Sequence, residues 1–199
     1  MTPPIIFGIT GASGAPYAVR LLQQLAAAKR PVSLIISSHG FRLLDTEMAI
    51  GSIQSLRLAV GKKPWDTYVK TYANEDRGAP PASGSALSAG MVVCPCSMGT
   101  LSAISVGASR SLIERAADVI LKERRKLILV PRETPLNAIH LQNMLRLSRA
   151  GAVVLPAAPA FYHKPATIDD MIDFIVARVL DQLGVEHKLG KRWDGSHAM

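Results

Sequence analysis

The first residues suited to chemistry form a glycine-rich loop that follows a short apolar run. The run at residues 5–9 is β-branched and aromatic, which predicts a buried strand, and Gly11, Ser13 and Gly14 come directly after it. Pro16 suits the first turn of a helix, so the loop is expected to present free backbone N–H groups at a helix N-terminus. Such a terminus favours a phosphate group.

Polar side chains also follow the later apolar runs. Ser37 ends one such run, Ser97 ends another, and Arg132 ends a third. The carboxyl ends of parallel strands meet at one edge of a sheet, where open α/β folds bind their ligands. We therefore expect these groups to converge with Ser13 on a common rim.

Apolar runs and segments with helical spacing alternate along the chain, which predicts an α/β fold with a mainly parallel sheet. The expected strands are 5–9, 32–36, 90–96, 127–130 and 152–155, and the expected helices are 17–28, 41–50, 112–125, 139–150 and 168–183. Residues 51–77 are predicted to be a weakly ordered connection with short elements.

Length and charge narrow the class of protein. A chain of 199 residues that is 48% hydrophobic can bury one core, so one domain is expected over residues 1–186, followed by a polar tail at 187–199. The formal net charge of +8 indicates anionic ligands. Aromatic residues make up only 5% of the chain, so a nucleic-acid surface is not expected.

Cysteine usage and the starting segment favour a reducing, cytoplasmic setting. Cys94 and Cys96 are the only cysteines, which excludes a disulfide framework and gives no zinc site. Residues 78–109 carry no charge, but prolines, glycines and serines interrupt the stretch, so membrane insertion is not expected. The start shows no secretory signal.

A nicotinamide site is disfavoured by two observations. The spacing Gly8-x-x-Gly11-x-x-Gly14 differs from the dinucleotide fingerprint. Ser37 and Ser38 stand where such a site usually has an acidic residue.

Six ordered motifs resemble the flavin prenyltransferases, a family formerly described as aromatic-acid decarboxylases. They are Thr10-Gly11-Ala12-Ser13-Gly14-Ala15, Pro81-Ala82-Ser83-Gly84-Ser85, Cys94-Pro95-Cys96-Ser97, the segment 114–125, Arg132-Glu133-Thr134-Pro135-Leu136 and Pro159-Ala160-Phe161-Tyr162-His163. The resemblance implies a flavodoxin-like or Rossmann-like three-layer α/β/α fold. It also implies a homo-oligomer, typically a dodecamer, that joins the dimethylallyl group of dimethylallyl phosphate to reduced FMN without a metal. The prenylated FMN would then serve a separate decarboxylase.

The resemblance carries residue roles onto matching positions. The FMN contacts fall on Gly11, Ala12, Ser13, Ser37, Ser97, Met98, Gly99, Thr100, Arg115 and Arg132. The contacts to the allylic phosphate fall on Lys122, Arg132, Tyr162 and Arg178, with Glu133 alongside, and Glu47 is implied to move protons together with Ser13.

These residue types suit the implied chemistry. Breaking an allylic C–O bond leaves a phosphate dianion, which lysine and arginine stabilise in the way a metal does elsewhere. Ring formation on the flavin releases protons, which requires a base such as Glu47. Considered without the resemblance, Lys122 and Arg115 are ordinary surface cations, Arg132–Glu133 is a local ion pair, and Tyr162 is a packed aromatic.

The sequence departs from the family pattern at two positions and leaves other functions open. Arg77 replaces a tryptophan found in some members, which affects the expected packing on the prenyl chain, and Arg110-Ser111 replaces an asparagine-type pair. Pro81-Ala82-Ser83 is also similar to a motif of flavin-dependent decarboxylases that act on cysteine-type substrates. A flavin carrier without catalytic activity is a further alternative.

Overall fold

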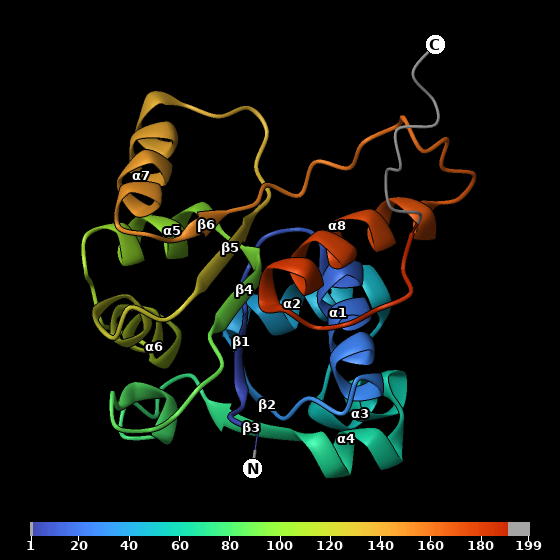
Figure 1. Ribbon diagram of the computed structural model, residues 1–199, viewed down its shortest axis with the longest axis horizontal. Helices are drawn as coiled ribbons and strands as arrows, with labels where there is room; N and C mark the ends of the chain where they lie inside the picture. Colours follow the sequence, from blue (N-terminus) through green and yellow to red (C-terminus); the bar gives the residue numbers. More distant parts are fainter. Residues whose placement is uncertain (1, 191–199) are drawn as a thin grey trace.

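The central feature of the fold is a six-stranded parallel sheet, seen in a computed structural model that describes residues 2–190 (Figure 1). Its strands are β1 (Ile5–Ile9), β2 (Val32–Ile36), β3 (Val69–Ala73), β4 (Met91–Cys96), β5 (Leu127–Pro131) and β6 (Val153–Val154). They lie in the order β3-β2-β1-β4-β5-β6, and each neighbouring pair is parallel. This is the Rossmann order, with its switch point between β1 and β4.

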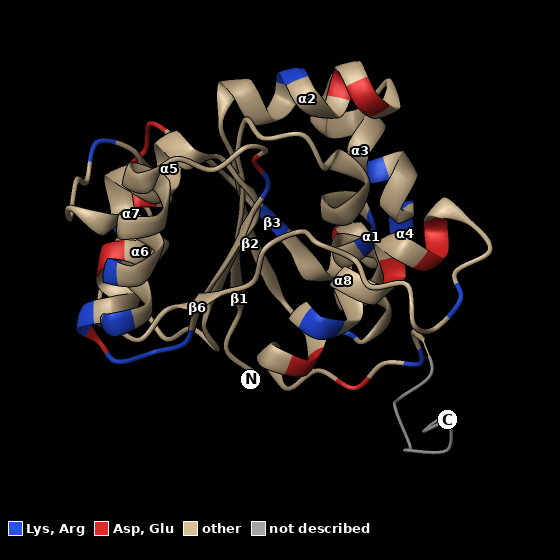
Figure 2. Cartoon of the chain, turned by 90° about the horizontal axis from the view of Figure 1, so that it is seen from above, with Lys and Arg blue, Asp and Glu red and all other residues tan. Residues whose placement is uncertain are grey.

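Helices cover both faces of the sheet, which confirms the three-layer α/β/α prediction (Figure 2). They are α1 (Ala15–Ala27), α2 (Ser38–Met48), α3 (Ile53–Val60), α4 (Lys62–Tyr68), the short 3₁₀ helix η1 (Pro80–Ala82), α5 (Met98–Ser105), α6 (Leu112–Lys122), α7 (Ala138–Arg149) and α8 (Ile168–Leu183). In Figure 2, α5, α6 and α7 lie on one side of the sheet and α1–α4 and α8 on the other.

The central strands are buried on both faces because their sequences are almost continuously apolar. All five residues of β1 are buried. Ile5 and Phe7 pack in the core under α1 and α8, whereas Ile6 packs in the core under α5 and α6. This alternation follows from the two-residue period of a strand. Because all the strands are parallel, the residues that follow them lie at one edge of the sheet.

The segment 51–77 is more regular than the sequence analysis predicts. It contains α3, α4 and the edge strand β3, so the expected short elements are confirmed and the expected weak order is wrong. β3 begins directly after α4 without a loop, and its residues are half-buried or exposed, so the continuous apolar run that marks the central strands is missing. Edge strands have one open side and need less apolar sequence.

Two predicted helix boundaries shift for identifiable reasons. α2 starts at Ser38, before the predicted position, because the Ser37 side chain accepts a hydrogen bond from Gly40 N–H and caps the helix. α6 ends at Lys122, before the predicted residue 125, and Arg124 adopts a left-handed backbone just beyond it.

The first residues of the predicted tail are packed. The His187 ring is only 5% exposed and hydrogen-bonds through Nε2 to Asp181 on α8 at 3.2 Å. Residues 191–199 of the predicted tail lie outside the described residues. Between residues 2 and 190, no helix has the length and apolar character needed to cross a bilayer.

Candidate active site

The rim at the carboxyl ends of β1, β2 and β4 gathers the predicted serines. Thr10 links two of these strand ends, because its Oγ1 donates to the Pro95 carbonyl at 2.9 Å and accepts from Ser97 N–H at 2.8 Å. Ser97 then caps α5 by accepting from Thr100 N–H at 3.2 Å. Ser37 lies beside them, with its N–H donating to the Ile9 carbonyl at the end of β1. The predicted placement of these serines at one edge is therefore confirmed.

The glycine-rich loop is held by two charged side chains from other elements. Glu47, in the last turn of α2, accepts at Oε2 from Gly14 N–H at 3.0 Å and from Ala15 N–H at 2.8 Å. Arg132, just after β5, donates from Nε to the Ser13 carbonyl at 3.3 Å. The expected free N–H groups at the start of α1 are thus partly used by a carboxylate of the chain itself, which the positive end of the helix stabilises.

The backbone of this rim leaves room for a flat ligand. A Cβ on Gly11 would lie 2.4 Å from the Cβ of His39, so only glycine allows α2 to approach the loop this closely. A Cβ on Gly99, in the first turn of α5, would have nothing within 4 Å. Hydroxyl groups, the Arg132 guanidinium and open backbone on one rim fit the phosphate and ring of FMN.

Tyr162, in the loop before α8, and Arg178, on α8, are both placed by their relation to Phe174. The Tyr162 ring meets Phe174 edge-on, with centroids 6.0 Å apart. Arg178 follows Phe174 by one turn and pairs with Asp181 at 3.3 Å, its side chain 56% exposed. Phe174 is therefore the residue of α8 that lies near both of these predicted donor-binding residues.

Lys122 and Arg115 lie on α6, which runs away from the rim. Its first residue, Leu112, donates its N–H to the Asn74 carbonyl beyond β3, whereas its far end adjoins the start of β4 through Lys126. Lys122, 49% exposed, pairs with Glu123, and Arg115 pairs with Asp118 at 2.7 Å. Because α6 places Lys122 near the amino ends of the strands, a single chain does not bring it to the rim that holds Ser13.

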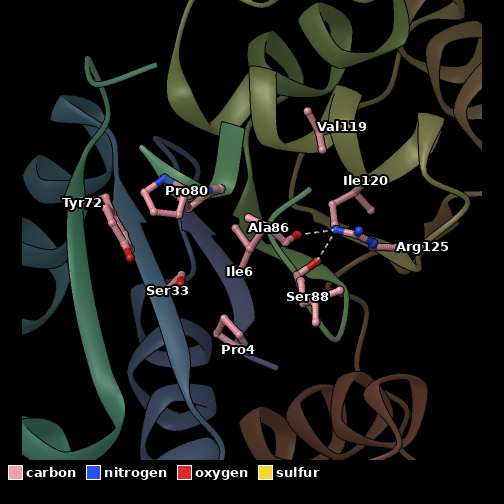
Figure 3. Close-up of a pocket in the computed structure, with 12 residues that line it drawn as sticks. Pro4, Ile6, Ser33, Tyr72, Pro80, Ala86, Ser88, Val119, Ile120 and Arg125 are labelled. Carbon is pink, nitrogen blue, oxygen red and sulfur yellow. Dashed lines mark hydrogen bonds between the residues drawn. The ribbon is translucent and has the colours of Figure 1, made fainter. Parts of the chain in front are cut away.

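A small cavity of about 60 Å³ lies at this opposite edge, bounded by the starts of β1 and β2 and by the end of α6 (Figure 3). Arg125 forms one wall and donates to the carbonyls of Ala86 and Gly84, each at 2.8 Å, and to Ser88 Oγ at 3.4 Å. Arg125 thereby fixes the Ser83–Gly84–Ser85 turn against Lys122 and Glu123. No local pattern in the sequence marks this role, because the carbonyl partners of Arg125 lie about forty residues earlier in the chain.

Glu133 and the two departures from the family pattern have local partners. Glu133 accepts at Oε1 from Thr134 N–H at 3.2 Å and is exposed. Arg77 donates to the Ser109 carbonyl at 3.4 Å, and Arg110 pairs with the buried Glu114 at 3.3 Å. Both departing arginines therefore lie close to the start of α6.

The two cysteines have no place in the chemistry of the rim. Both are free and buried in β4. Burial raises the pKa of the Cys94 thiol, with a further contribution from Cys96, and raises the pKa of Cys96 to about 12. Neither is a thiolate at neutral pH, so neither acts as a nucleophile.

The fold and the rim together define an α/β flavoprotein, and the Flavoprotein family model matches residues 2–180. Flavin prenyltransferase UbiX of Halalkalibacterium halodurans is 50% identical over 188 residues, which cover 94% of this chain and 91% of the relative. The Pseudomonas aeruginosa enzyme of the same name is 46% identical, over 97% of this chain and 95% of the relative. The chain therefore belongs to the flavin prenyltransferase family.

Two crystal structures extend the comparison. AnUbiX (PadA1), in complex with FMN and dimethylallyl pyrophosphate, superposes with a TM-score of 0.89 at 40% identity, covering 98% of this chain and 99% of that one. A dodecameric FMN-dependent UbiX-like decarboxylase from Escherichia coli O157:H7 gives a TM-score of 0.88 at 44% identity, covering 96% and 100%.

Proposed function

We propose that the chain transfers the dimethylallyl group of dimethylallyl phosphate to reduced FMN and releases prenylated FMN. The observation that carries this proposal is the likeness, over almost the whole chain, to a structure that holds FMN and a dimethylallyl diphosphate together. In the reaction the allylic C–O bond breaks, its electron pair leaves with the phosphate, and the allylic carbon bonds to a flavin nitrogen, which loses its proton. The ring closes when the alkene of the transferred group takes up a proton and its far carbon bonds to a ring carbon of the flavin, which loses a proton in turn.

The rim is proposed to bind FMN. Ser37 and Ser97, each at the start of a helix, and the Arg132 guanidinium supply donors for an anionic group. The open side of Gly99 leaves space for the ring. Glu47 has one carboxylate oxygen anchored by Gly14 and Ala15, and we assign the other oxygen to the flavin proton, with Ser13 beside it.

The donor phosphate is proposed to lie among cations that one chain does not bring together. Tyr162, in the loop before α8, offers a hydroxyl, and Arg178 on α8 and Arg132 after β5 offer guanidinium groups. Lys122 lies on α6, together with Arg115 of the FMN set. We propose that α6 of a neighbouring copy completes the site, in a homo-oligomer of dodecamer type. The dodecameric relative supports this arrangement. Growing charge on the phosphate would be stabilised by these cations in place of a metal.

The decisive experiment is anaerobic incubation of the purified protein with reduced FMN and dimethylallyl phosphate. A flavin that gains one five-carbon group by mass spectrometry is the expected product, and a parallel reaction with the diphosphate identifies the preferred donor. Absence of any adduct with either donor overturns the proposal. Tight FMN binding without an adduct would instead indicate a flavin carrier, and carbon dioxide release from a cysteine-type substrate would indicate a decarboxylase.

We also propose that a separate decarboxylase in the cytoplasm receives the product. Prenylated FMN made here must leave its site to be used elsewhere, and the exposed rim between α2 and α5 provides an exit. Adding this protein's product to an inactive apo-decarboxylase should restore carbon dioxide release. Product that activates no such enzyme would argue against this step.

A further inference from the structure

The end of α6 packs directly against the turn at residues 83–86. A Cβ built on Gly84 would lie 2.3 Å from Glu123 Oε1 and 2.8 Å from Lys122 Nζ, so the Lys122–Glu123 ion pair lies on the bare Cα of this glycine. Any side chain at residue 84 would occupy the place of the two charged groups. The backbone of the turn therefore sets where the Lys122 ammonium can lie.

Arg125 fixes this turn through its guanidinium group. Its Nη2 donates to the Gly84 carbonyl and its Nη1 to the Ala86 carbonyl, each at 2.8 Å, and Nη1 also reaches Ser88 Oγ at 3.4 Å (Figure 3). Two bonds from one planar group to carbonyls two residues apart hold both the position and the orientation of the backbone between them. A lysine in this place would offer a single ammonium and could not form the same fork.

The backbone of Arg125 is tied to the helix turn that carries Lys122. Arg124 has a left-handed backbone, its N–H donates to the Leu121 carbonyl at 3.1 Å, and the Arg125 N–H donates to the Ile120 carbonyl at 3.0 Å. These two bonds form the Schellman motif that closes many helices. Arg125 thus joins the end of α6 by its main chain and the turn at residues 83–86 by its side chain.

Lys122 depends on such support because it is an exposed cation on a long, flexible stem. Its side chain is 49% exposed, and ordering that stem when an anion binds costs conformational entropy. The Glu123 carboxylate accepts one N–H of the ammonium, which leaves two N–H groups for a phosphate. Lys122, by its hydrogen bond and charge, and then Arg125, by its charge, lower the pKa of Glu123, so this partner is ionised at neutral pH.

We propose that Arg125 is a positioning residue for Lys122. Its fork holds the Gly84 backbone, and this backbone with Glu123 holds the ammonium where it meets the phosphate of the allylic donor in a neighbouring copy. This inference rests on the proposed function, because that function gives Lys122 its ligand. Charge grows on the phosphate as the C–O bond breaks, and displacing a stabilising group by about 1 Å can cost about 100-fold in rate.

The first test measures adduct formation by full-length Arg125 variants. Arg125→Ala is expected to lower kcat/KM for dimethylallyl phosphate about 30-fold, with the Kd for FMN and the oligomeric state unchanged, because the rim lies at the other edge of the sheet. Arg125→Lys keeps the charge but loses the fork, and should be nearly as impaired. Arg124→Ala removes the neighbouring exposed cation and is the matched control, with kcat/KM expected within about twofold of wild type.

Gly84→Ala tests the contact without changing Arg125. The new methyl group would meet only the ends of two flexible side chains, so the urea midpoint should stay close to wild type while the ammonium is displaced. We expect kcat/KM for the donor to fall about tenfold or more. A Gly84→Ala or Arg125→Lys enzyme with the kcat/KM of wild type would overturn the inference.

A double-mutant cycle with Lys122→Ala identifies the residue through which Arg125 acts. If it acts through the ammonium, Arg125→Lys should change the residual kcat/KM of Lys122→Ala by less than about threefold. Losses that multiply in the double variant would show that Arg125 acts by another route, and would also overturn the inference. Wild-type protein that forms no adduct with either allylic donor defeats the proposed function instead, so the two failures are distinguishable.

Discussion

Arg132 and Glu47 hold opposite ends of one peptide group. Arg132 Nε donates to the carbonyl of Ser13 at 3.3 Å, and Glu47 Oε2 accepts from the N–H of Gly14, the other end of that peptide, at 3.0 Å. A cation on the carbonyl and an anion on the N–H both favour the same orientation of the peptide dipole. The loop direction is therefore set by side chains 119 and 33 residues away in the sequence.

Substitution of Glu47 should separate loop structure from proton transfer. In Glu47→Gln an amide oxygen still accepts from Gly14 and Ala15, so the Kd for FMN should stay within about threefold of wild type. Because glutamine cannot act as a base, Glu47→Gln should slow ring formation on the flavin by about 100-fold or more. Glu47→Ala removes both hydrogen bonds and should also weaken FMN binding roughly tenfold. Fluorescence titration and adduct formation measure the two effects, and a Glu47→Gln enzyme with normal turnover would contradict the assigned role.

Two glycine substitutions should have opposite effects on stability. Gly99→Ala adds a methyl group where nothing lies within 4 Å, so the folded protein should gain about 0.5 kcal/mol from the better helix former while losing FMN affinity to the methyl group. Gly11→Ala places a Cβ 2.4 Å from that of His39 and should reduce both stability and FMN affinity. Urea unfolding without ligand and FMN titration distinguish them. A Gly99→Ala protein with full FMN affinity would place the ring elsewhere.

The sequence could predict what depends on local pattern. Ser37 and Ser97 each follow an apolar run that forms a strand, and each caps the helix that comes next. Their position on the rim can therefore be predicted from neighbouring residues alone. The anchoring of Gly14 by Glu47 could not be found this way. It depends on how α2 packs across the start of α1, which no local spacing encodes.

The position of Lys122 shows a second limit of sequence reasoning. The motif that contains Lys122 is found by its resemblance to the family. The edge of the sheet that Lys122 reaches depends on the direction of α6, which runs from Asn74 back toward the start of β4. In a parallel sheet the connecting helix returns toward the amino ends, so a cation in its last turn lies opposite the ligand edge. Applying that rule to residues 112–122 would have predicted this separation.

Mixed oligomers should reveal whether Lys122 serves a neighbouring copy. The Lys122→Ala and Glu47→Gln variants are each expected to be nearly inactive on their own. Mixed oligomers, obtained by co-expressing the two variants with different tags and purifying on both tags, should recover activity. With equal expression, roughly a quarter of the sites would combine two native halves, because each half is native in about half of the copies. Lys126→Ala, which removes a cation bonded to the Gln182 carbonyl, is the matched control and should keep its activity. Mixed oligomers as inactive as their parents would place both residues in the same chain's site.

Acid should weaken the cap of α8, the helix that carries Phe174 and Arg178. The Asp170 carboxylate accepts from Thr167 N–H and Ala166 N–H, each at 2.9 Å, while Thr167 Oγ1 accepts from Asp170 N–H at 3.1 Å. Hydrogen bonds from Thr167 and then from Ala166 lower the pKa of Asp170 below its usual range. Since the folded-state pKa is lowered, this stabilisation is complete above the unfolded pKa of about 4 and is lost as the pH falls through the folded value.

Asp170→Asn should therefore have a lower urea midpoint than wild type at pH 6, and the difference should shrink toward pH 3. Asp169→Asn is the control, because it removes a charge from the same turn and leaves the hydrogen bonds between Thr167 and Asp170 intact. Its urea midpoint at pH 6 should stay closer to that of wild type. Equal losses of stability in both variants would refute the capping role of Asp170.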